Sequence, residues 1–240
     1  MKLLTASFDF RLFLKLVFGF IAFTIIGTLS HESGHYIVAK CLGYEAKINY
    51  NSSWYYDKNN EAFLESHWKL YSQQIISDQK FPDKERWDRL KFKRQRDSYW
   101  ITLGGSMQTM LTGTVGLVLL WFFRKRYYSA TALSFPLWLL VFVSLFWLRQ
   151  AANFFVGATR FLVYDPFRSH SDEFVLARRM NIPEWTLSTI TASIALIILA
   201  VVIFKFIPIK QRLTFMLAGI VGGVSGYLLW QTYLGKTIMP

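Results

Sequence analysis

The residues that decide the fold run from Phe8 to Leu42 and read FDFRLFLKLVFGFIAFTIIGTLSHESGHYIVAKCL. Most of this stretch is apolar, and no proline interrupts it before Gly43. About 20 apolar residues in a helix cross about 30 Å of hydrocarbon, so the stretch is long enough to span a membrane. Glycine commonly ends a helix by adopting the left-handed conformation. We therefore predict one membrane helix over residues 8–42 that stops at Gly43.

The composition of the whole chain agrees with a membrane location. Its 240 residues are 53% hydrophobic, 18% aromatic and only 18% charged, which is too apolar for a soluble domain of this size. The net charge is +12, but the basic residues lie mainly between or beside hydrophobic runs. Basic residues in such places contact anionic headgroups and set the orientation of membrane proteins. We expect membrane lipids as partners, no nucleic acid, and a location in the cell (inner) membrane.

Further apolar runs follow the first helix. The additional crossings are expected at about residues 99–123, 185–207 and 213–233. The second and the last crossing are rich in glycine, which lets neighbouring helices approach closely. The run over residues 130–164 is interrupted by Arg149, Gln150 and Asn153, and it forms either one long helix or two shorter segments.

Residues 43–98 are polar, charged and aromatic, and they contain no apolar run of spanning length. We expect them to form a loop subdomain outside the hydrocarbon, with short strands at 47–50 and 53–56 and a charged helix over 83–96. Together with this loop, the chain forms a single membrane-embedded domain over residues 1–240. The predicted fold class is an all-α polytopic membrane protein with about five or six hydrophobic helical segments and one polar loop subdomain.

The strongest chemical signal is the motif His31-Glu32-Ser33-Gly34-His35 near the end of the first helix. Residues four apart project from one face of a helix, so His31 and His35 can direct ring nitrogens at one metal ion. A zinc ion lowers the pKa of its bound water from about 15.7 towards about 7, and a neighbouring carboxylate can take the proton. Ionisable residues at membrane depth are expensive, which marks them as candidates for function. The motif predicts a zinc site with Glu32 as general base.

A catalytic zinc ion needs a third protein ligand. The best candidates lie in the segment DPFRSHSDE over residues 165–173. We rank Asp172 first, Glu173 second and His170 third. Each of them has an ordinary alternative role, in a solvated loop or at the start of a helix over residues 173–180 that Ser171 or Asp172 caps.

Membrane topology tests this choice. If residues 130–164 cross the membrane once, Asp172 emerges on the side of the histidine motif, whereas two crossings place it on the opposite side. The metal site therefore favours a single long or re-entrant element there. Arg149, Gln150 and Asn153 then become buried polar groups that face a site or a water cavity, although hydrogen bonding between helices is their commoner use.

A His-Glu-x-x-His motif in the first of several hydrophobic helices, with an aspartate from a later segment, resembles the site-2 protease family of intramembrane zinc metalloproteases. The resemblance implies His31 and His35 as zinc ligands and Glu32 as catalytic base. It also implies Asp172 as the third ligand, here without the Asn-x-x-Pro element and the following glycine of the family. Residues 104–108, GGSMQ, are similar to a Gly-x-x-x-Asn element of many members, with glutamine in place of asparagine.

These observations predict an intramembrane zinc metalloprotease that hydrolyses peptide bonds of membrane-associated or transmembrane substrates. One alternative is a zinc-binding membrane scaffold or chaperone, which has no need of Glu32 as a base. The other alternative is a transporter whose histidines and carboxylates carry metal or protons. No inverted repeat is evident in the sequence, which disfavours the transporter.

Overall fold

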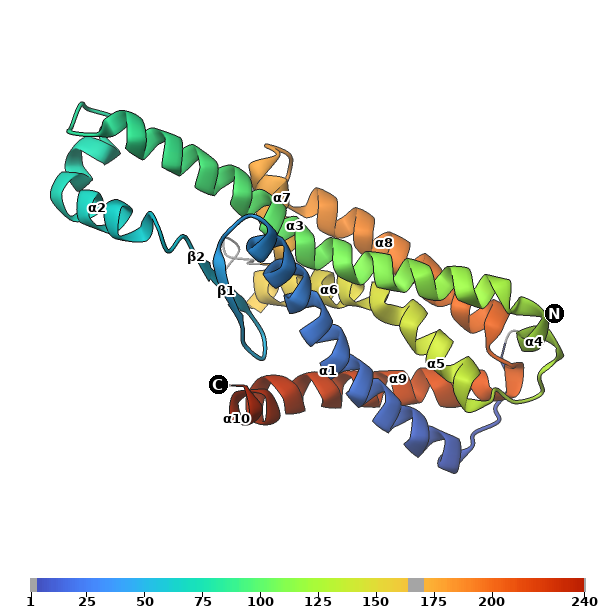
Figure 1. Ribbon diagram of the computed structural model, residues 1–240. Helices are drawn as coiled ribbons and strands as arrows, with labels where there is room; N and C mark the ends of the chain where they lie inside the picture. Colours follow the sequence, from blue (N-terminus) through green and yellow to red (C-terminus); the bar gives the residue numbers. More distant parts are fainter. Residues whose placement is uncertain (1–3, 164–170, 240) are drawn as a thin grey trace.

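The computed structural model describes residues 4–163 and 171–239 (Figure 1). Its regular structure is almost entirely helical, with one two-stranded antiparallel sheet among the described residues. Within the same ranges, five helical stretches are long and apolar enough to cross a membrane, so the predicted all-α polytopic membrane fold is confirmed. These stretches are Phe10–Cys41, Lys84–Phe122, Phe135–Val163, Trp185–Phe206 and Ile209–Ile238. The elements in chain order are α1 (Phe10–Cys41), β1 (Glu45–Ile48), β2 (Ser53–Tyr56), α2 (Glu61–Ile76), α3 (Lys84–Phe122), α4 (Arg124–Ser129), α5 (Phe135–Ser144), η1 (Leu145–Trp147), α6 (Leu148–Val163), α7 (Asp172–Arg179), α8 (Trp185–Val201), η2 (Val202–Phe206), α9 (Ile209–Leu229), η3 (Trp230–Leu234) and α10 (Gly235–Ile238).

Capping groups set both ends of α1. At its start, the carboxylate of Asp9 accepts a hydrogen bond of 3.0 Å from a backbone N–H of the first turn. At its end, Gly43 has a φ of +86°. The N–H groups of Gly43 and Tyr44 donate to the carbonyls of Lys40 and Ala39, each at 3.0 Å. This is the Schellman pattern, and it confirms the predicted stop at Gly43.

Helix α1 crosses the bundle obliquely and packs most extensively against α3 and α9 (Figure 1). Glycines permit this approach. A Cβ atom added to Gly222 would lie 2.7 Å from the carbonyl oxygen of Val17. One added to Gly34 would lie 2.5 Å from the carbonyl oxygen of Gly104. The close helix contacts predicted from the glycines are therefore present, and they bring the histidine motif against α3.

The apolar run over residues 130–164 forms one crossing, Phe135–Val163, in which the short 3₁₀ turn η1 joins α5 to α6. A side chain on Gly116 of α3 would collide with the backbone of Ser144, so this kinked part of the crossing lies directly on α3. Because the run crosses once, α6 returns the chain to the end of the bundle where the histidine motif lies. The sequence allowed either one or two segments here, and the observed single crossing is the topology that the predicted metal site requires.

The segment between α1 and the second crossing divides into two parts. Strands β1 and β2 form an antiparallel hairpin, in which Glu45 pairs with Tyr56 and Ile48 pairs with Ser53. The first strand lies two residues earlier than predicted, at Glu45–Ile48. It ends at Ile48 because Asn49 already belongs to the turn and donates its N–H to the carbonyl of Ser52 at 2.8 Å. Helix α2 and the first half of α3 form an arm that extends away from the bundle (Figure 1).

The charged helix expected over residues 83–96 and the crossing expected from residue 99 are one continuous helix, α3, of 39 residues. The sequence between Lys84 and Leu103 contains no glycine or proline, the residues that commonly end a helix. The charged helix therefore continues into the crossing without a break. The α3 part of the arm is therefore continuous with the second crossing.

An apolar core occupies the half of the bundle farther from the motif. The ring centroid of Phe20 on α1 lies 4.9 Å from that of Phe142 on α5 and 5.3 Å from that of Phe215 on α9. Phe20 is about three helical turns before His31. The polar groups around His31 consequently lie outside this core, and apolar packing does not account for their presence.

Candidate metal centre and its cavity

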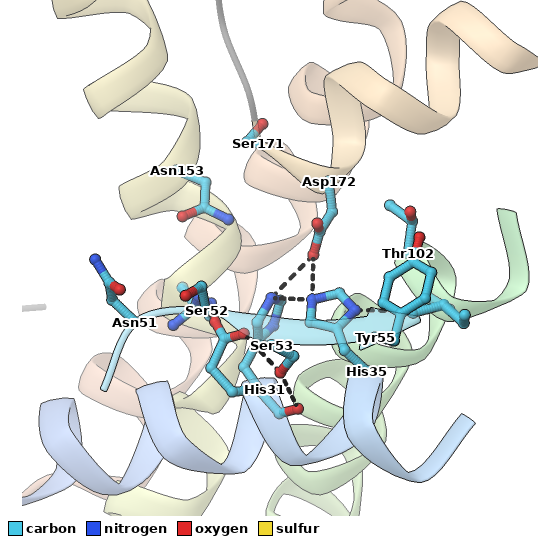
Figure 2. A pocket seen from close by; sticks show the side chains of 13 residues that line it. His31, His35, Asn51, Ser52, Ser53, Tyr55, Thr102, Asn153, Ser171 and Asp172 are labelled. Carbon is cyan, nitrogen blue, oxygen red and sulfur yellow. Dashed lines mark hydrogen bonds and ion pairs between the residues drawn. The ribbon is translucent and has the colours of Figure 1, made fainter. Parts of the chain in front are cut away.

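Three side chains from α1 and α7 converge at one point (Figure 2). Oδ2 of Asp172 lies 2.9 Å from Nε2 of His31 and 3.2 Å from Nε2 of His35, and the two Nε2 atoms are 3.2 Å apart. A tetrahedral zinc ion with bonds of about 2.0–2.1 Å separates its ligand atoms by about 3.3 Å. The triangle thus has the size of one face of a zinc coordination tetrahedron, and the donor set fits that metal.

Helix α3 orients the ring of His35. Nδ1 of His35 lies 2.6 Å from the backbone carbonyl oxygen of Ile101. A carbonyl oxygen only accepts hydrogen bonds, so Nδ1 carries the proton and Nε2 keeps its lone pair for a metal ion. By contrast, Nδ1 of His31 is buried and has no hydrogen-bond partner among the described residues. The fold therefore sets the tautomer of one histidine of the pair.

Gly105 makes the space that the His35 ring occupies. A Cβ atom on Gly105 would lie 2.8 Å from Cδ2 of that ring and would overlap its Nε2 edge. We expect Gly105→Ala to displace the ring and to lower zinc affinity about 10- to 100-fold, the range typical of lost support for a metal ligand. Competition with a zinc chelator measures this. Gly223→Ala on α9 is the matched control, because its added Cβ would meet nothing within 4 Å. Equal zinc affinities in the two variants would contradict the role of Gly105.

The two neighbouring carboxylates at the start of α7 point to different partners. Glu173 is only 3% exposed, and its carboxylate accepts hydrogen bonds from the hydroxyl of Ser106 at 3.1 Å and the amide of Asn153 at 3.4 Å. Asp172 meets the histidines, and its Oδ2 also lies 3.5 Å from the Ser106 hydroxyl. The structure thus brings the first-ranked candidate ligand to the motif and turns the second towards α3 and α6. The third, His170, lies outside the described residues.

The electrostatics of the two carboxyl groups also differ. Burial and the adjacent charge of Asp172 raise the pKa of the Glu173 carboxyl group, which favours its protonated form. Burial also opposes ionisation of Asp172, but the nearby imidazoles of His31 and His35 outweigh it and hold the pKa of Asp172 well below its usual range. Because a metal ligand must be deprotonated, this environment favours Asp172 over Glu173 as a ligand.

Glu32 stands beside the triangle and is 5% exposed. Its carboxylate oxygen Oε2 lies 3.1 Å from the hydroxyl of Ser53, which also lies 2.8 Å from the backbone carbonyl oxygen of Glu32 (Figure 2). Its other oxygen, Oε1, lies 3.7 Å from Nη2 of Arg149. The hairpin and α6 therefore hold this carboxylate from two sides. Sequence reasoning missed Ser53, since only its position in an expected strand set it apart.

These groups line a cavity of about 340 Å³, a volume typical of ligand pockets. Its walls come from α1, the β-hairpin, α3, α6 and the start of α7. Arg149 and Asn153 line it, as expected for polar groups that face a site. Gln150 does not line it and is 1% exposed, buried among the helices.

No family model, curated protein or solved structure matches this chain. Membership of the site-2 protease family therefore stays a prediction from the motif.

The last crossing, Ile209–Ile238, anchors the hairpin wall of the cavity through its turn η3. The indole N–H of Trp230 donates to the backbone carbonyl of Tyr50 at 2.7 Å, and the amide of Asn51 donates to Oε1 of Gln231 at 3.2 Å. Both partners on the helix belong to the π-helical turn η3. Such turns often occur at functional sites. The position of Ser53 over Glu32 thus depends on a contact between residues about 180 positions apart.

Proposed function

We propose that this chain is an intramembrane zinc metalloprotease that hydrolyses peptide bonds of membrane-associated or transmembrane substrates. The observation that carries the proposal is the triangle of His31 Nε2, His35 Nε2 and Asp172 Oδ2 with the carboxylate of Glu32 beside it. Catalytic zinc sites use three protein ligands and leave a position open, whereas structural sites are closed by four. A structural zinc site also has no use for an adjacent base.

The residues divide the chemistry among them. His31, His35 and Asp172 would hold the zinc ion, which when bound supplies a Lewis acid that lowers the pKa of a coordinated water to about 7. Glu32 lines the same cavity and accepts the proton of the attacking water, then delivers it to the leaving amine as the C–N bond breaks. Ser53 keeps the Glu32 carboxylate in place through its hydroxyl.

The depth of the site supports a membrane substrate. Glu32 precedes Cys41, the last residue of α1, by nine positions. This corresponds to about 14 Å along the helix, so the site belongs to a helix that is long and apolar enough to cross a membrane. The polar side chains around the cavity, among them Asn51, Ser52 and Thr102, provide hydrogen-bonding partners for water and for an unwound peptide.

We expect the purified protein to carry about one zinc ion per chain, because two histidines and an aspartate already have tetrahedral spacing. Elemental analysis of protein prepared without chelators measures the content. A variant with both His31→Ala and His35→Ala serves as the control and should contain no stoichiometric zinc. Wild-type protein that holds no transition metal, and takes up none when zinc is added, would rule out the proposed function.

A further inference from the structure

One cationic side chain lines the cavity among the described residues, and it is Arg149 of α6. Asn153 follows it by one helical turn and lines the same cavity, so this face of α6 is directed at the site. Nη2 of Arg149 lies 3.7 Å from Oε1 of Glu32, and Asp172 lines the same cavity. The side chain of Arg149 is 25% exposed, and an arginine in a membrane-spanning helix is expensive, which marks it as a candidate for function.

The hydrogen-bonding capacity of Arg149 is largely unused. A guanidinium has five N–H donors and forms charge-assisted hydrogen bonds of about 2.7–2.9 Å. Here Nη1 lies 3.5 Å from the hydroxyl of Thr28, and Nη2 lies 3.7 Å from Oε1 of Glu32. Nε is buried and has no hydrogen-bond partner among the described residues. If Arg149 only neutralised Glu32, a short bidentate pair would be expected, since loose pairing does not offset the desolvation of two charges.

We propose that Arg149 forms an anion subsite in the cavity and acts as a catalytic residue, donating hydrogen bonds to the substrate carbonyl oxygen as that oxygen becomes negative. This inference rests on the proposed protease function. Preorganised donors aimed at developing charge are often the largest single contribution to catalysis. Arg149 adds a positive charge where the reaction creates a negative one.

The proton and electron balance of the step is simple. When the oxygen of water bonds to the carbonyl carbon, the π electron pair of the C=O bond moves to the carbonyl oxygen, and Glu32 holds the released proton. When the C–N bond breaks, that pair re-forms the C=O bond and the proton goes to the leaving nitrogen. Arg149 keeps its own protons throughout, because a guanidinium is not deprotonated in proteins.

A binding experiment tests the subsite without turnover, with inorganic phosphate as the probe, a small tetrahedral oxyanion. Zinc-loaded Glu32→Gln is compared with the zinc-loaded double variant Glu32→Gln/Arg149→Met, which removes both charges of the pair together. We expect phosphate affinity, measured by calorimetry, to fall about 10- to 150-fold in the double variant, the range for a lost hydrogen bond to a charged group. Arg160→Met in the Glu32→Gln background removes an exposed arginine of the same helix and should leave the affinity unchanged.

Kinetics separate the oxyanion role from simple substrate binding. In the otherwise wild-type protein, Arg149→Met should lower kcat about 100- to 1,000-fold with little change in KM or zinc content. Arg149→Lys keeps the charge and should retain the fold and part of the rate. A rise in KM at constant kcat overturns the proposal, because Arg149 would then bind a fixed anion of the substrate.

Three further outcomes also overturn it. The first is equal phosphate binding with and without Arg149, and the second is no phosphate binding to zinc-loaded Glu32→Gln. The third is loss of zinc or of the fold in the Arg149 variants, including Arg149→Lys. The last result would make Arg149 a structural support of the metal site. Zinc content is measured first in every protein. Absence of zinc from wild type defeats the proposed function itself, and this measurement separates that result from a failure of the Arg149 subsite alone.

Discussion

Glu32→Gln should retain zinc and the native fold while reducing peptide-bond cleavage about 100- to 10,000-fold, the usual effect of removing a general base. Glutamine has the size of glutamate and its side-chain oxygen can still accept the hydrogen bond from Ser53. It cannot accept the proton of the attacking water. The measurements are zinc content, circular dichroism in detergent, and cleavage of a panel of single-span membrane peptides followed by mass spectrometry.

A matched control for this variant is Glu65→Gln, which changes an exposed glutamate on the arm helix α2. It should cleave like wild type. The two alternative functions predict different results for Glu32→Gln, because a scaffold or chaperone would keep its own phenotype and a transporter would change flux without any proteolytic product. If a product accumulates equally with Glu32→Gln and wild type, Glu32 is not the base and the proposed mechanism fails even when zinc is present.

The other large effect is a loss of zinc affinity when the proposed third ligand, Asp172, is removed. Asp172→Ala should weaken zinc binding by more than about 100-fold, beyond the 10- to 100-fold range for residues that only support a ligand. It removes one of three atoms that already have tetrahedral spacing, at 2.9 and 3.2 Å from the two Nε2 atoms. Chelator competition on the purified variants measures the change.

Glu173→Ala and His170→Ala are the comparison variants for Asp172, and both should have smaller effects on zinc affinity. Glu173 hydrogen-bonds Ser106 and Asn153, so its loss disturbs the helix contacts around the site more than the metal ligands themselves. Zinc retention that is unchanged in Asp172→Ala but lost in one of these neighbours would assign the third ligand to that neighbour.

Several features of this protein follow from the sequence alone, because they depend on residues that are close together in the chain. The length of the apolar run and the left-handed conformation of Gly43 determine where α1 lies and where it stops. The spacing of four residues in one helix places His31 and His35 on one face, whatever surrounds them. The single crossing over residues 130–164 does not follow from the apolar run, which allows one or two segments. It was favoured because Asp172 must emerge on the side of the histidine motif to act as a zinc ligand.

Only the tertiary structure decided which side chains meet the histidines. Asp172 and Glu173 are adjacent, and both are carboxylates at the start of a helix, so no local rule separates them. The packing of α7 against α3 does so, because it places Glu173 at Ser106 and Asn153 and leaves Asp172 at the motif. In the same way, Ser53 reaches Glu32 because the hairpin docks on the last crossing, Ile209–Ile238. Arg149 reaches it because α5 and η1, which lead into α6, pack on α3. These contacts join residues far apart in the chain, and their geometry depends on how whole helices pack against one another.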